Sequence, residues 1–398
     1  MWLILSNLYK NISLFVNLFI LKFIMDRDTL LPAGFSDKIY PKSQKNSLII
    51  ENIVNFFLNY GYLRISPPLI EFEETLLNQG PGLALKNNSY RVMDPISKKM
   101  MAVRSDMTTQ ISRISSKRLA HYPRPLRLSY SGEVLRVNPS GLKLERQIAQ
   151  VGAEIIGDIT CDLETEIIII GLKVLKELDL EDLTLDLNYQ NLRLSFFKPL
   201  SELPDSELLF KAIEKKDINY LKNKNFPNKN NILNIIQASG QYTNKNEFLE
   251  KLNEDNKKNN HLLHMLEVSS SIQKIFKNLN IVLDPLEKST FDYHSGITFT
   301  IFSKSLHGSI AKGGTYKTIN EEDATGISLY VDLLGGIKNV FVEKEKVLIE
   351  QNDFKNAENL IKQGYQIIFF KNIDNNIVNY AKSINCKYFF KNNKLIQV

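Results

Sequence analysis

Between Lys42 and Tyr60 apolar residues recur at helical spacing, at Ile49, Ile50, Ile53, Phe56 and Phe57. Because Gly61 follows as a C-terminal stop, this pattern predicts an amphipathic helix. Residues 89–94 and 99–104 are two short alternating runs, and Asp94-Pro-Ile-Ser joins them. The alternation and the turn residues together predict a β-hairpin.

A helix is expected to begin at Asp106, whose carboxylate can accept hydrogen bonds from free backbone N–H groups. Residues 125–137 and 146–157 are predicted strands, and a helix is predicted from Asp162 through Leu175. Strand-like sequence returns at 281–284, 296–302 and 309–314. A mostly apolar helix is predicted from Gly326 to Leu334.

Strands and helices follow one another without a regular βαβ rhythm, which predicts an α+β fold with an antiparallel sheet flanked by helices. Residues from about 197 to 279 are polar and helical, which indicates an inserted helical module. Beyond about residue 344, four strands are predicted, near 347–349, 365–370, 387–390 and 394–398, with helices at 354–363, capped by Asp353, and near 376–383. We therefore expect an extension at 1–25, a core at 26–342 and a small α/β unit at 343–398.

With 398 residues, of which 43% are hydrophobic, the chain can bury a sizeable core. The net charge of +6 comes largely from lysines beside asparagines, as in Lys222-Asn-Lys-Asn225. Such stretches favour solvated loops over a nucleic-acid surface, because no aromatic residues interleave for stacking. Charge alone does not identify a partner.

Cys161 and Cys386 lie far apart, so neither a disulfide framework nor a zinc site is expected, and the setting is predicted to be reducing cytoplasm. No metal and no cofactor are expected. The apolar run from Ile12 to Leu21 is too short to span a bilayer, which needs about 20 residues. We interpret residues 1–24 as an extension upstream of Met25, which we take as the working start of translation; a membrane anchor is the alternative.

Several segments match the segments of a known family in their order and spacing along the chain. They are Leu31-Pro-Ala-Gly-Phe-Ser-Asp37, Val103-Arg-Ser-Asp-Met-Thr108, 125–136, 146–157, Phe291-Asp-Tyr-His-Ser-Gly296 and Ala311-Lys-Gly-Gly-Thr-Tyr316. From Leu31 to about Gly336 the chain resembles histidyl-tRNA synthetase and, more closely, its paralogue family, the regulatory subunits of ATP phosphoribosyltransferase. The resemblance implies a class II aminoacyl-tRNA synthetase-like core, in which Pro68 corresponds to the motif 1 proline at the dimer interface.

The departures from the synthetase pattern bear on function. Uncharged residues stand where that family has arginines or a glutamate, namely Ser289, Leu333, Thr315 and Asn138. Activation of an amino acid by ATP needs fixed positive charge around both reacting groups, and the loss of one such donor costs roughly 3 kcal/mol or more. Only about 55 residues follow Glu343, too few for a long anticodon-reading domain. Aminoacylation is disfavoured on both counts.

The residue types that hold a free amino acid remain. The resemblance implies a histidine-binding set of Asp106, Thr108, Arg136, Gln150, Glu154, Tyr293 and His294. Carboxylates and polar oxygens would surround the α-ammonium group, Arg136 would take the α-carboxylate, and Tyr293 with His294 would close on the imidazole. Each residue also has a plain structural interpretation: Asp106 as a helix cap, Gln150 and Glu154 on a solvated strand edge, Arg136 in a surface ion pair, and the aromatic pair in a core.

The expected function is that of a non-catalytic regulatory subunit of ATP phosphoribosyltransferase, which supports the first step of histidine biosynthesis and mediates feedback by histidine. Its expected partners are a short-form catalytic subunit and free histidine, within a hetero-oligomer that contains a homodimer of this chain. No nucleic acid and no membrane are expected as partners. The alternatives are a histidyl-tRNA synthetase-like aminoacylating enzyme and a tRNA-binding module without catalysis.

Overall fold

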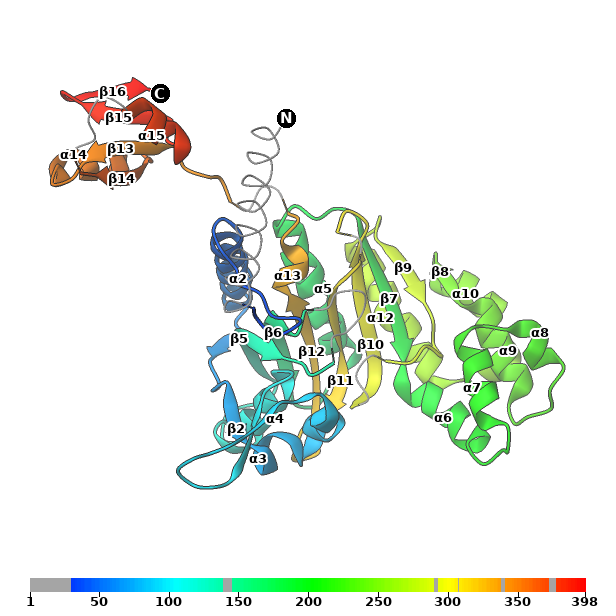
Figure 1. Ribbon diagram of the computed structural model, residues 1–398. Coiled ribbons are helices and arrows are strands. Elements are labelled where there is room, and N and C mark those ends of the chain that lie inside the picture. Colours follow the sequence, from blue (N-terminus) through cyan, green and yellow to red (C-terminus); the bar gives the residue numbers. More distant parts are fainter. Residues whose placement is uncertain (1–29, 139–144, 290–292, 307, 338–340, 372–376) are drawn as a thin grey trace, which may run out of the picture. The chain divides into compact units, whose positions relative to one another are not determined.

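The computed structural model describes residues 30–138, 145–289, 293–306, 308–337, 341–371 and 377–398. The expected extension at 1–25 lies outside these residues, as do Phe291 and Asp292 of the quoted segment. The chain divides into two compact units, the first ending at Ile337 and the second comprising Lys338–Val398. Figure 1 labels the elements of both, and each unit is described by itself.

A nine-stranded sheet forms the centre of the first unit within the described residues. Its strands lie in the order β1 (Leu63–Ile65), β5 (Leu126–Leu135), β6 (Gln147–Ile156), β12 (Asp323–Tyr330), β11 (Gly308–Lys317), β10 (His294–Ser303), β7 (Leu183–Tyr189), β9 (Asn280–Leu283) and β8 (Gly240–Tyr242). Only the β1–β5 and β7–β9 pairs are parallel among these neighbours. The predicted α+β class with a mostly antiparallel sheet is confirmed.

One face of this sheet is covered by helices α2 (Lys42–Asn59), α5 (Cys161–Glu177) and α12 (Asn260–Ile275). Helix α5 begins where the Thr160 side chain accepts a hydrogen bond from the Leu163 N–H at 3.4 Å. Gly171 lets α5 approach β12 closely, because a Cβ there would lie 2.2 Å from Ile327 Cδ1. Helices α2 and α5 confirm the elements predicted from Lys42 and Asp162.

The other face is partly covered by α4 (Thr108–Lys117). Ile111 of this helix and Met107, which directly precedes it, pack against Leu128 and Tyr130 of β5. Helix α4 begins two residues after the predicted start, but the Asp106 Oδ1 atom still accepts from the Thr108 N–H at 2.8 Å. Beside α4 lies a small sheet in the order β2 (Ile70–Phe72), β4 (Met100–Val103) and β3 (Arg91–Met93), with α3 (Glu73–Leu77) and the 3-10 helix η1 (Gly80–Asn88). The antiparallel pairing of β3 and β4 confirms the predicted hairpin.

The expected helical insertion is present, and it begins earlier than predicted. Its helices are α6 (Gln190–Leu200), α7 (Ser206–Glu214), α8 (Ile218–Lys222), α9 (Lys229–Ala238), α10 (Lys245–Lys251), α11 (Glu254–Lys257) and α12. The insertion also contributes β8, which pairs with β9 at the edge of the large sheet. A three-residue strand inside a polar segment gives no alternating pattern, so the sequence did not predict it.

The predicted apolar helix from Gly326 to Leu334 is wrong. Residues up to Tyr330 belong to strand β12, and only Val331–Leu334 form a helical turn, α13. Strand β12 lies between β11 and β6 and is buried from Ala324 to Tyr330. A strand buried on both faces loses the usual alternation, so its periodicity cannot be distinguished from that of a buried helix.

The second unit is a four-stranded sheet in the order β14 (Gln366–Phe370), β13 (Lys346–Glu350), β15 (Tyr388–Lys391) and β16 (Lys394–Gln397). Helix α14 (Phe354–Lys362) contributes Ala357 and Leu360 to one small core, and α15 (Ile377–Ser383) contributes Ala381 to another. The Asp353 side chain caps α14 by accepting from the Asn356 N–H at 3.4 Å. All six elements predicted for this unit are present.

Candidate functional site

A polar band crosses the face of the large sheet that α4 partly covers. In one row of facing residues, Glu154, Gly326, Gly314, Thr298 and Asn188 follow one another across five strands. The next row is Gly152, Ser328, Lys312, Thr300 and Asp186. Polar and glycine residues in register on one face give a floor with hydrogen-bonding groups and little side-chain volume.

A pocket of about 220 Å³, measured with the solvent at its mouth, opens over this band. It is lined by Thr108, Glu154, Tyr293, His294, Lys312, Gly313, Gly314, Tyr316, Gly326 and Ser328. Gly326 is required by the geometry, because a Cβ there would lie 1.6 Å from Glu154 Oε2. The backbone of β12 therefore leaves just enough room for the carboxylate of β6.

Asp106, Thr108 and Glu154 form one buried cluster. The Thr108 hydroxyl donates to Glu154 Oε1 at 3.0 Å, and its backbone N–H donates to Asp106 Oδ1 at 2.8 Å. Asp106 and Glu154 are only 1% exposed. Among the described residues, Asp106 Oδ2 and Glu154 Oε2 accept no hydrogen bond. Each buried carboxylate thus keeps one oxygen available to a bound donor.

Gln150 extends this cluster along β6. Its amide Nε2 donates to the Ser328 hydroxyl at 2.7 Å, and its Oε1 accepts from the Met107 N–H at 3.1 Å. The Tyr130 hydroxyl lies 3.2 Å from Glu154 Oε1 and 3.1 Å from the Ser328 hydroxyl. Gln150 and Glu154 are therefore inside the molecule and not on a solvated strand edge.

Burial raises the pKa of the Glu154 carboxyl to about 8, and the nearby Asp106 carboxylate adds to this effect against the hydrogen bond from Thr108. Desolvation disfavours the charged form of an acid, and a second negative charge acts in the same direction. With these neighbours Glu154 is mostly protonated at neutral pH. A cation placed beside it would reverse that preference.

Arg136 is buried at the end of the same cluster. Its Nε donates to the Ser105 carbonyl at 3.2 Å, and its Nη2 lies 3.9 Å from Asp106 Oδ2. The guanidinium carbon is 5.3 Å from the centre of the Tyr330 ring. A side chain that is 5% exposed is not a surface ion-pair partner, and it places a fixed positive charge at this end of the pocket.

Tyr293 and His294 form the opposite wall. Their rings lie 4.8 Å apart, and Tyr293 also contacts Tyr316 edge-on at 5.9 Å. His294 Nδ1 is 2.8 Å from the Ser289 hydroxyl, and burial lowers the pKa of this imidazole to about 3. His294 is therefore neutral at physiological pH and can donate or accept a hydrogen bond according to its tautomer.

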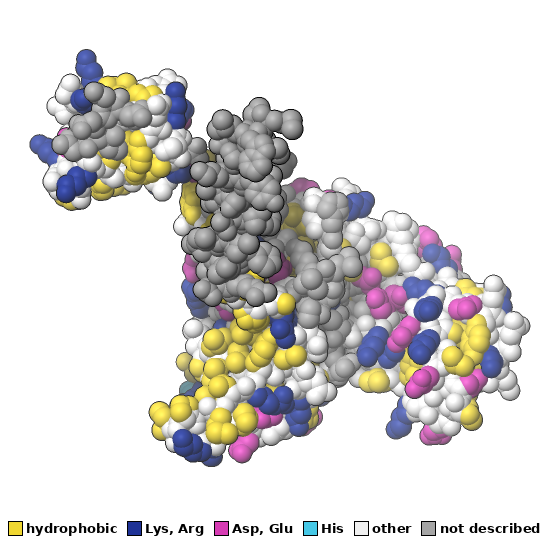
Figure 2. Space-filling view, viewed as in Figure 1, with side chains coloured by type: hydrophobic (Ala, Val, Ile, Leu, Met, Phe, Trp, Pro, Cys, Tyr) yellow, Lys and Arg dark blue, Asp and Glu magenta, His cyan; other side chains and the backbone are white. Residues whose placement is uncertain are grey.

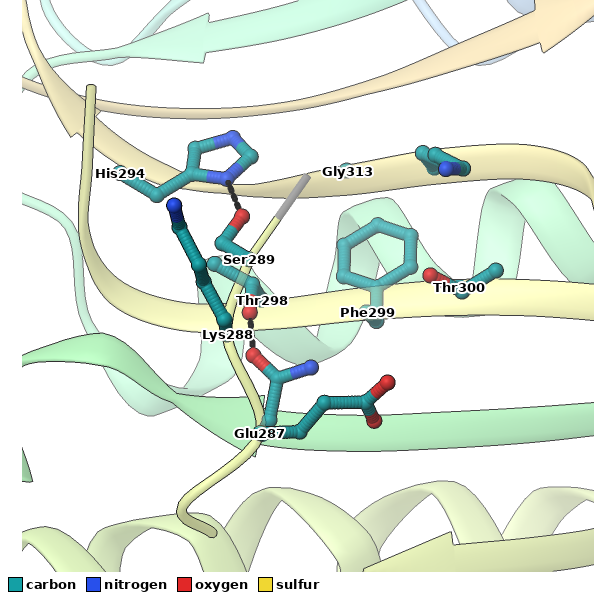
Figure 3. Close-up of a pocket in the computed structure, with 10 residues that line it drawn as sticks. Glu287, Lys288, Ser289, His294, Thr298, Phe299, Thr300 and Gly313 are labelled. Atoms are coloured by element: carbon teal, nitrogen blue, oxygen red, sulfur yellow. Dashed lines mark hydrogen bonds between the residues drawn. The ribbon is translucent and has the colours of Figure 1, made fainter. Parts of the chain in front are cut away.

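A second pocket of about 300 Å³, also measured with solvent at its mouth, adjoins the first across His294, Lys312 and Gly313 (Figure 3). Figure 3 shows the Ser289–His294 contact at one end and the Glu287 side chain reaching toward the other. The floor here is Thr298, which donates to the Asn188 side chain, and Thr300. The two pockets thus lie side by side on the sheet and share these three lining residues.

The four positions that depart from the synthetase pattern have distinct surroundings. Ser289 bonds His294, Leu333 is a partly buried hydrocarbon, and Asn138 is exposed, with its N–H donating to the Asn88 side chain at 2.8 Å. The Thr315 hydroxyl donates to Glu164 on the far side of the sheet. None of the four can supply the charge that an arginine would bring.

The structure brings all seven predicted site residues around one pocket or its immediate shell. Sequence analysis did not identify Tyr130, Lys312, Tyr316 and Ser328, which contact the same space. Period-two spacing from Gly314 and Gly326 would have indicated Lys312, Tyr316 and Ser328, once β11 and β12 were both recognised as strands.

Within the described residues there is no group of three or more His, Cys, Asp or Glu side chains that could hold a metal ion. Among the residues that the structure describes, no helix is long and apolar enough to cross a membrane.

Comparisons with known proteins identify the family of this chain. The family model described as histidyl-tRNA synthetase matches residues 34–334. An ATP phosphoribosyltransferase regulatory subunit from Rhodospirillum centenum is 33% identical, over 85% of this chain and 88% of that protein. The corresponding subunit from Gluconobacter oxydans is 31% identical, over 91% of this chain and 95% of that protein.

Solved structures show the same fold. An ATP phosphoribosyltransferase regulatory subunit/histidyl-tRNA synthetase from Bacillus halodurans aligns with a TM-score of 0.73 at 18% identity, covering 89% of this chain and 96% of that one. Histidyl-tRNA synthetase from Nostoc sp. PCC 7120 aligns with a TM-score of 0.70 at 18% identity, covering 90% of each chain. The expected class II synthetase-like fold is confirmed.

Proposed function

The chain belongs to the histidyl-tRNA synthetase family and, within it, to the ATP phosphoribosyltransferase regulatory subunits, and on that premise we propose that it binds free histidine in the pocket of Asp106 and Glu154 and reports it to a catalytic partner. Its role is regulatory and not catalytic. The partner subunit carries the chemistry of the first step of histidine biosynthesis, while this chain supplies activation and feedback.

Two buried carboxylate oxygens that accept no hydrogen bond from the described residues carry this proposal. A buried polar group without a hydrogen bond costs free energy, and a buried carboxylate costs more. Asp106 Oδ2 and Glu154 Oε2 accept no bond from the described residues, although Thr108 satisfies the other oxygen of each carboxylate. An α-ammonium group brings three donors and a positive charge, which both oxygens require.

The rest of the pocket suits the rest of a histidine molecule. Arg136 brings a guanidinium group for the α-carboxylate. Gln150 holds the Ser328 hydroxyl and the Met107 N–H in place beside the cluster. Tyr293 and neutral His294 present a ring wall with hydrogen-bonding atoms to the imidazole. The predicted set of seven residues therefore contains one group for each polar part of the ligand.

The alternative of an aminoacylating enzyme is disfavoured by the same residues. An attack of the amino acid on the α-phosphate of ATP develops negative charge, which class II enzymes neutralise with arginines. Here Ser289 bonds His294, Thr315 bonds Glu164, and Leu333 is apolar. We expect no measurable exchange of pyrophosphate into ATP with histidine. The tRNA-binding alternative would require binding that weakens steeply with salt in a filter assay.

We further propose that two copies of this chain associate before they meet the catalytic subunit. Figure 2 shows apolar side chains gathered over the small sheet and α3. Leu69 beside Pro68 is 45% exposed, Phe72 and Met93 of the small sheet are 42% and 59% exposed, and Ile96 in the turn between β3 and β4 is 90% exposed. Apolar surface of this kind on a soluble unit marks an interaction site. The two free cysteines are consistent with assembly in reducing cytoplasm.

Calorimetric titration of histidine into the purified chain tests the proposal. We expect saturable binding, with histamine and imidazolepropionate each binding at least tenfold more weakly because one lacks the carboxylate and the other the ammonium group. Glu154→Gln should reduce histidine affinity, whereas Glu181→Gln, an exposed residue outside the pocket, should leave it unchanged. Equal affinity of the three compounds, or no heat of binding, contradicts the proposal.

A second measurement tests the regulatory role. The short-form catalytic subunit from the same source should turn over faster with this chain than alone, and histidine should reduce that gain. A variant that no longer binds histidine should keep the activation and lose the inhibition. Inhibition that is unchanged in the variant would place the histidine site on the catalytic subunit.

A further inference from the structure

Glu164 lies beneath the floor of the pocket, on the face of the sheet covered by α5. Its side chain is buried, at 4% exposure. Its Oε1 accepts from the Thr315 hydroxyl of β11 at 2.5 Å, and its Oε2 contacts His264 Nε2 of α12 at 2.5 Å. One buried carboxylate from α5 therefore joins a strand of the pocket floor to the last helix of the insertion.

On the strand side, the link reaches the pocket through alternation of side chains. Gly314 and Tyr316 line the pocket, so Thr315 between them points to the opposite face. Thr315 is also pressed against β10, because a Cβ on Gly296 would lie 2.9 Å from Thr315 Cβ. Any shift of Gly314 or Tyr316 that accompanies ligand binding must therefore move Thr315 as well.

On the helix side, the link ends in a small aromatic cluster. The Tyr189 ring, at the end of β7, lies 4.9 Å from the His261 ring and 5.9 Å from the His264 ring. Tyr189 is the residue before α6, and His261 and His264 lie in the first turns of α12, so the start of the insertion contacts the start of its last helix here. His264 is 32% exposed at its side chain and is the partner that can be released to solvent.

We propose that Glu164 is a positioning residue that couples the floor of the histidine pocket, through Thr315 and His264, to the docking of the helical insertion. The coupling rests on the proposed function in one respect only, since histidine is the ligand that would fill the pocket. The chain has a threonine at the position where the synthetase carries an arginine, and the short hydroxyl leaves space for the Glu164 contact. The docking of the insertion would then depend on whether the pocket holds a ligand, and a partner that contacts the insertion would detect that difference.

The charges around His264 support a dependence on pH. The Glu164 contact raises the pKa of His264 against the effect of burial, and Glu267 of α12 acts in the same direction as Glu164. His261 on α12 has its pKa lowered, by burial and by the proximity of His264, and Tyr189 of β7 has its pKa raised to about 12 by burial and Glu164. The protonated His264 pairs with Glu164 below its raised pKa, and the ion pair is lost above it.

Hydrogen exchange of the full-length protein tests the coupling. In the wild type, histidine should slow exchange of the α12 amides about fivefold or more, the usual lower range for coupled sites. Thr315→Val removes the hydroxyl with little change of shape and should reduce that effect below about twofold while histidine affinity by calorimetry is largely kept. Thr315→Ser retains the hydroxyl and should restore the protection.

His261→Gln is the matched control for His264→Gln. His261 is one turn earlier on α12 and contacts Tyr189, whereas the Glu164 carboxylate contacts the His264 ring. Protection of α12 should fall between pH 6 and pH 8 in the wild type and in His261→Gln, and this dependence should be absent in His264→Gln. A pH dependence that survives in His264→Gln overturns the proposal, as does a Thr315→Val variant that responds to histidine like the wild type.

A double-mutant cycle measured without histidine distinguishes a failure of the Glu164 coupling from a failure of histidine binding. Thr315→Val, His264→Phe and the double variant are compared by α12 exchange in the absence of histidine. Non-additive effects support the Glu164 link even if calorimetry shows no histidine binding, in which case only the proposed function fails. Additive effects reject the link whatever the ligand does.

Discussion

Glu154 shows how a single residue can be tuned by its neighbours. It accepts hydrogen bonds from Thr108 and Tyr130 through one oxygen, while the other has no partner among the described residues. Asp106 lies close enough to raise its pKa further. The empty pocket therefore favours a neutral Glu154, and an ammonium ligand favours the ionised form.

Stability should fall with rising pH because of this carboxyl. Its pKa is about 8 in the folded chain and near 4.3 when unfolded, so between these values the folded state binds more protons than the unfolded state. The Glu154 contribution is thus present below about pH 4 and lost as pH rises through about 8. Urea unfolding at pH 5.5 and pH 8 should show a smaller drop for Glu154→Gln than for the wild type; equal drops would contradict the assigned pKa.

Histidine binding should release a proton near pH 7. The ligand's ammonium group lowers the pKa of Glu154, so a carboxyl that was mostly neutral becomes ionised. Calorimetry in two buffers of different ionisation enthalpy measures the number of protons released. The wild type should release a substantial fraction of one proton more than Glu154→Gln, and the same buffer dependence in both would exclude Glu154 as the source.

Gly326 is the residue whose substitution should test the fit of the pocket floor. In Gly326→Ala the new Cβ would lie 1.6 Å from Glu154 Oε2, so the carboxylate or β12 must shift. We expect at least a tenfold loss of histidine affinity and a stability loss of roughly 1–3 kcal/mol in urea unfolding. Gly308→Ala is the control, because a Cβ at that position meets nothing within 4 Å.

At the residue scale, the sequence predicted the members of the site, which secondary-structure propensity alone could not have done. Asp106, Thr108, Gln150 and Glu154 were identified through the family resemblance, and burial now excludes the surface interpretation of Gln150 and Glu154. The partnerless oxygens and the pKa of Glu154 could not be predicted, because both depend on which strands are neighbours in the sheet. Spacing along one strand cannot reveal a carboxylate on β6 that faces a glycine on β12.

Among the elements, β12 and α13 form a segment whose structure the sequence pattern did not predict. The run from Gly326 to Leu334 is nearly all apolar, but the strand ends at Tyr330 and a single helical turn begins at Val331. Asp332 is the polar exception in that turn. It accepts from Lys38 Nζ at 3.0 Å, Asn46 Nδ2 at 3.1 Å and the Ala149 N–H at 2.9 Å. Amphipathic elements such as α2 and α14 were predicted well because one face of each is exposed.

Removal of Asp332 should loosen three elements together. Asp332→Ala leaves the Ala149 N–H and the Asn46 amide without this acceptor and separates the N-terminal loop, α2 and β6 from α13. We expect a loss of roughly 2–4 kcal/mol in the free energy of unfolding. Asp323→Ala on the preceding strand breaks only the half-exposed pair with Lys317 and should cost less than about 1 kcal/mol. Similar losses for both variants would show that Asp332 does not hold these elements together.

At the scale of the whole molecule, the two units have separate cores. Val347, Ala357 and Leu360 pack on one face of the second unit's sheet, and Leu348 and Phe389 pack on the other. All residues proposed to bind histidine belong to the first unit. We propose that the boundary near residue 338 separates binding from a different task of the C-terminal unit.

Truncation after Ile337 should therefore leave histidine affinity within about twofold of the full-length value, because no proposed ligand contact is removed. The measurement is calorimetry on both forms, with circular dichroism to establish that the shortened chain is folded. A loss of affinity in a folded truncated chain would show that the second unit contributes to the pocket.

The carboxylate oxygens of Asp106 and Glu154 that accept no hydrogen bond also bear on how much of the protein a cell contains. A ligand that satisfies them stabilises only the folded chain, and at one hundred times its dissociation constant the gain is about 2.7 kcal/mol. Proteases act on the unfolded fraction, which would shrink accordingly. A cell short of histidine would then contain fewer copies of this subunit, and a smaller fraction of them would have histidine bound. The supply of the amino acid would thus set the amount of its own sensor.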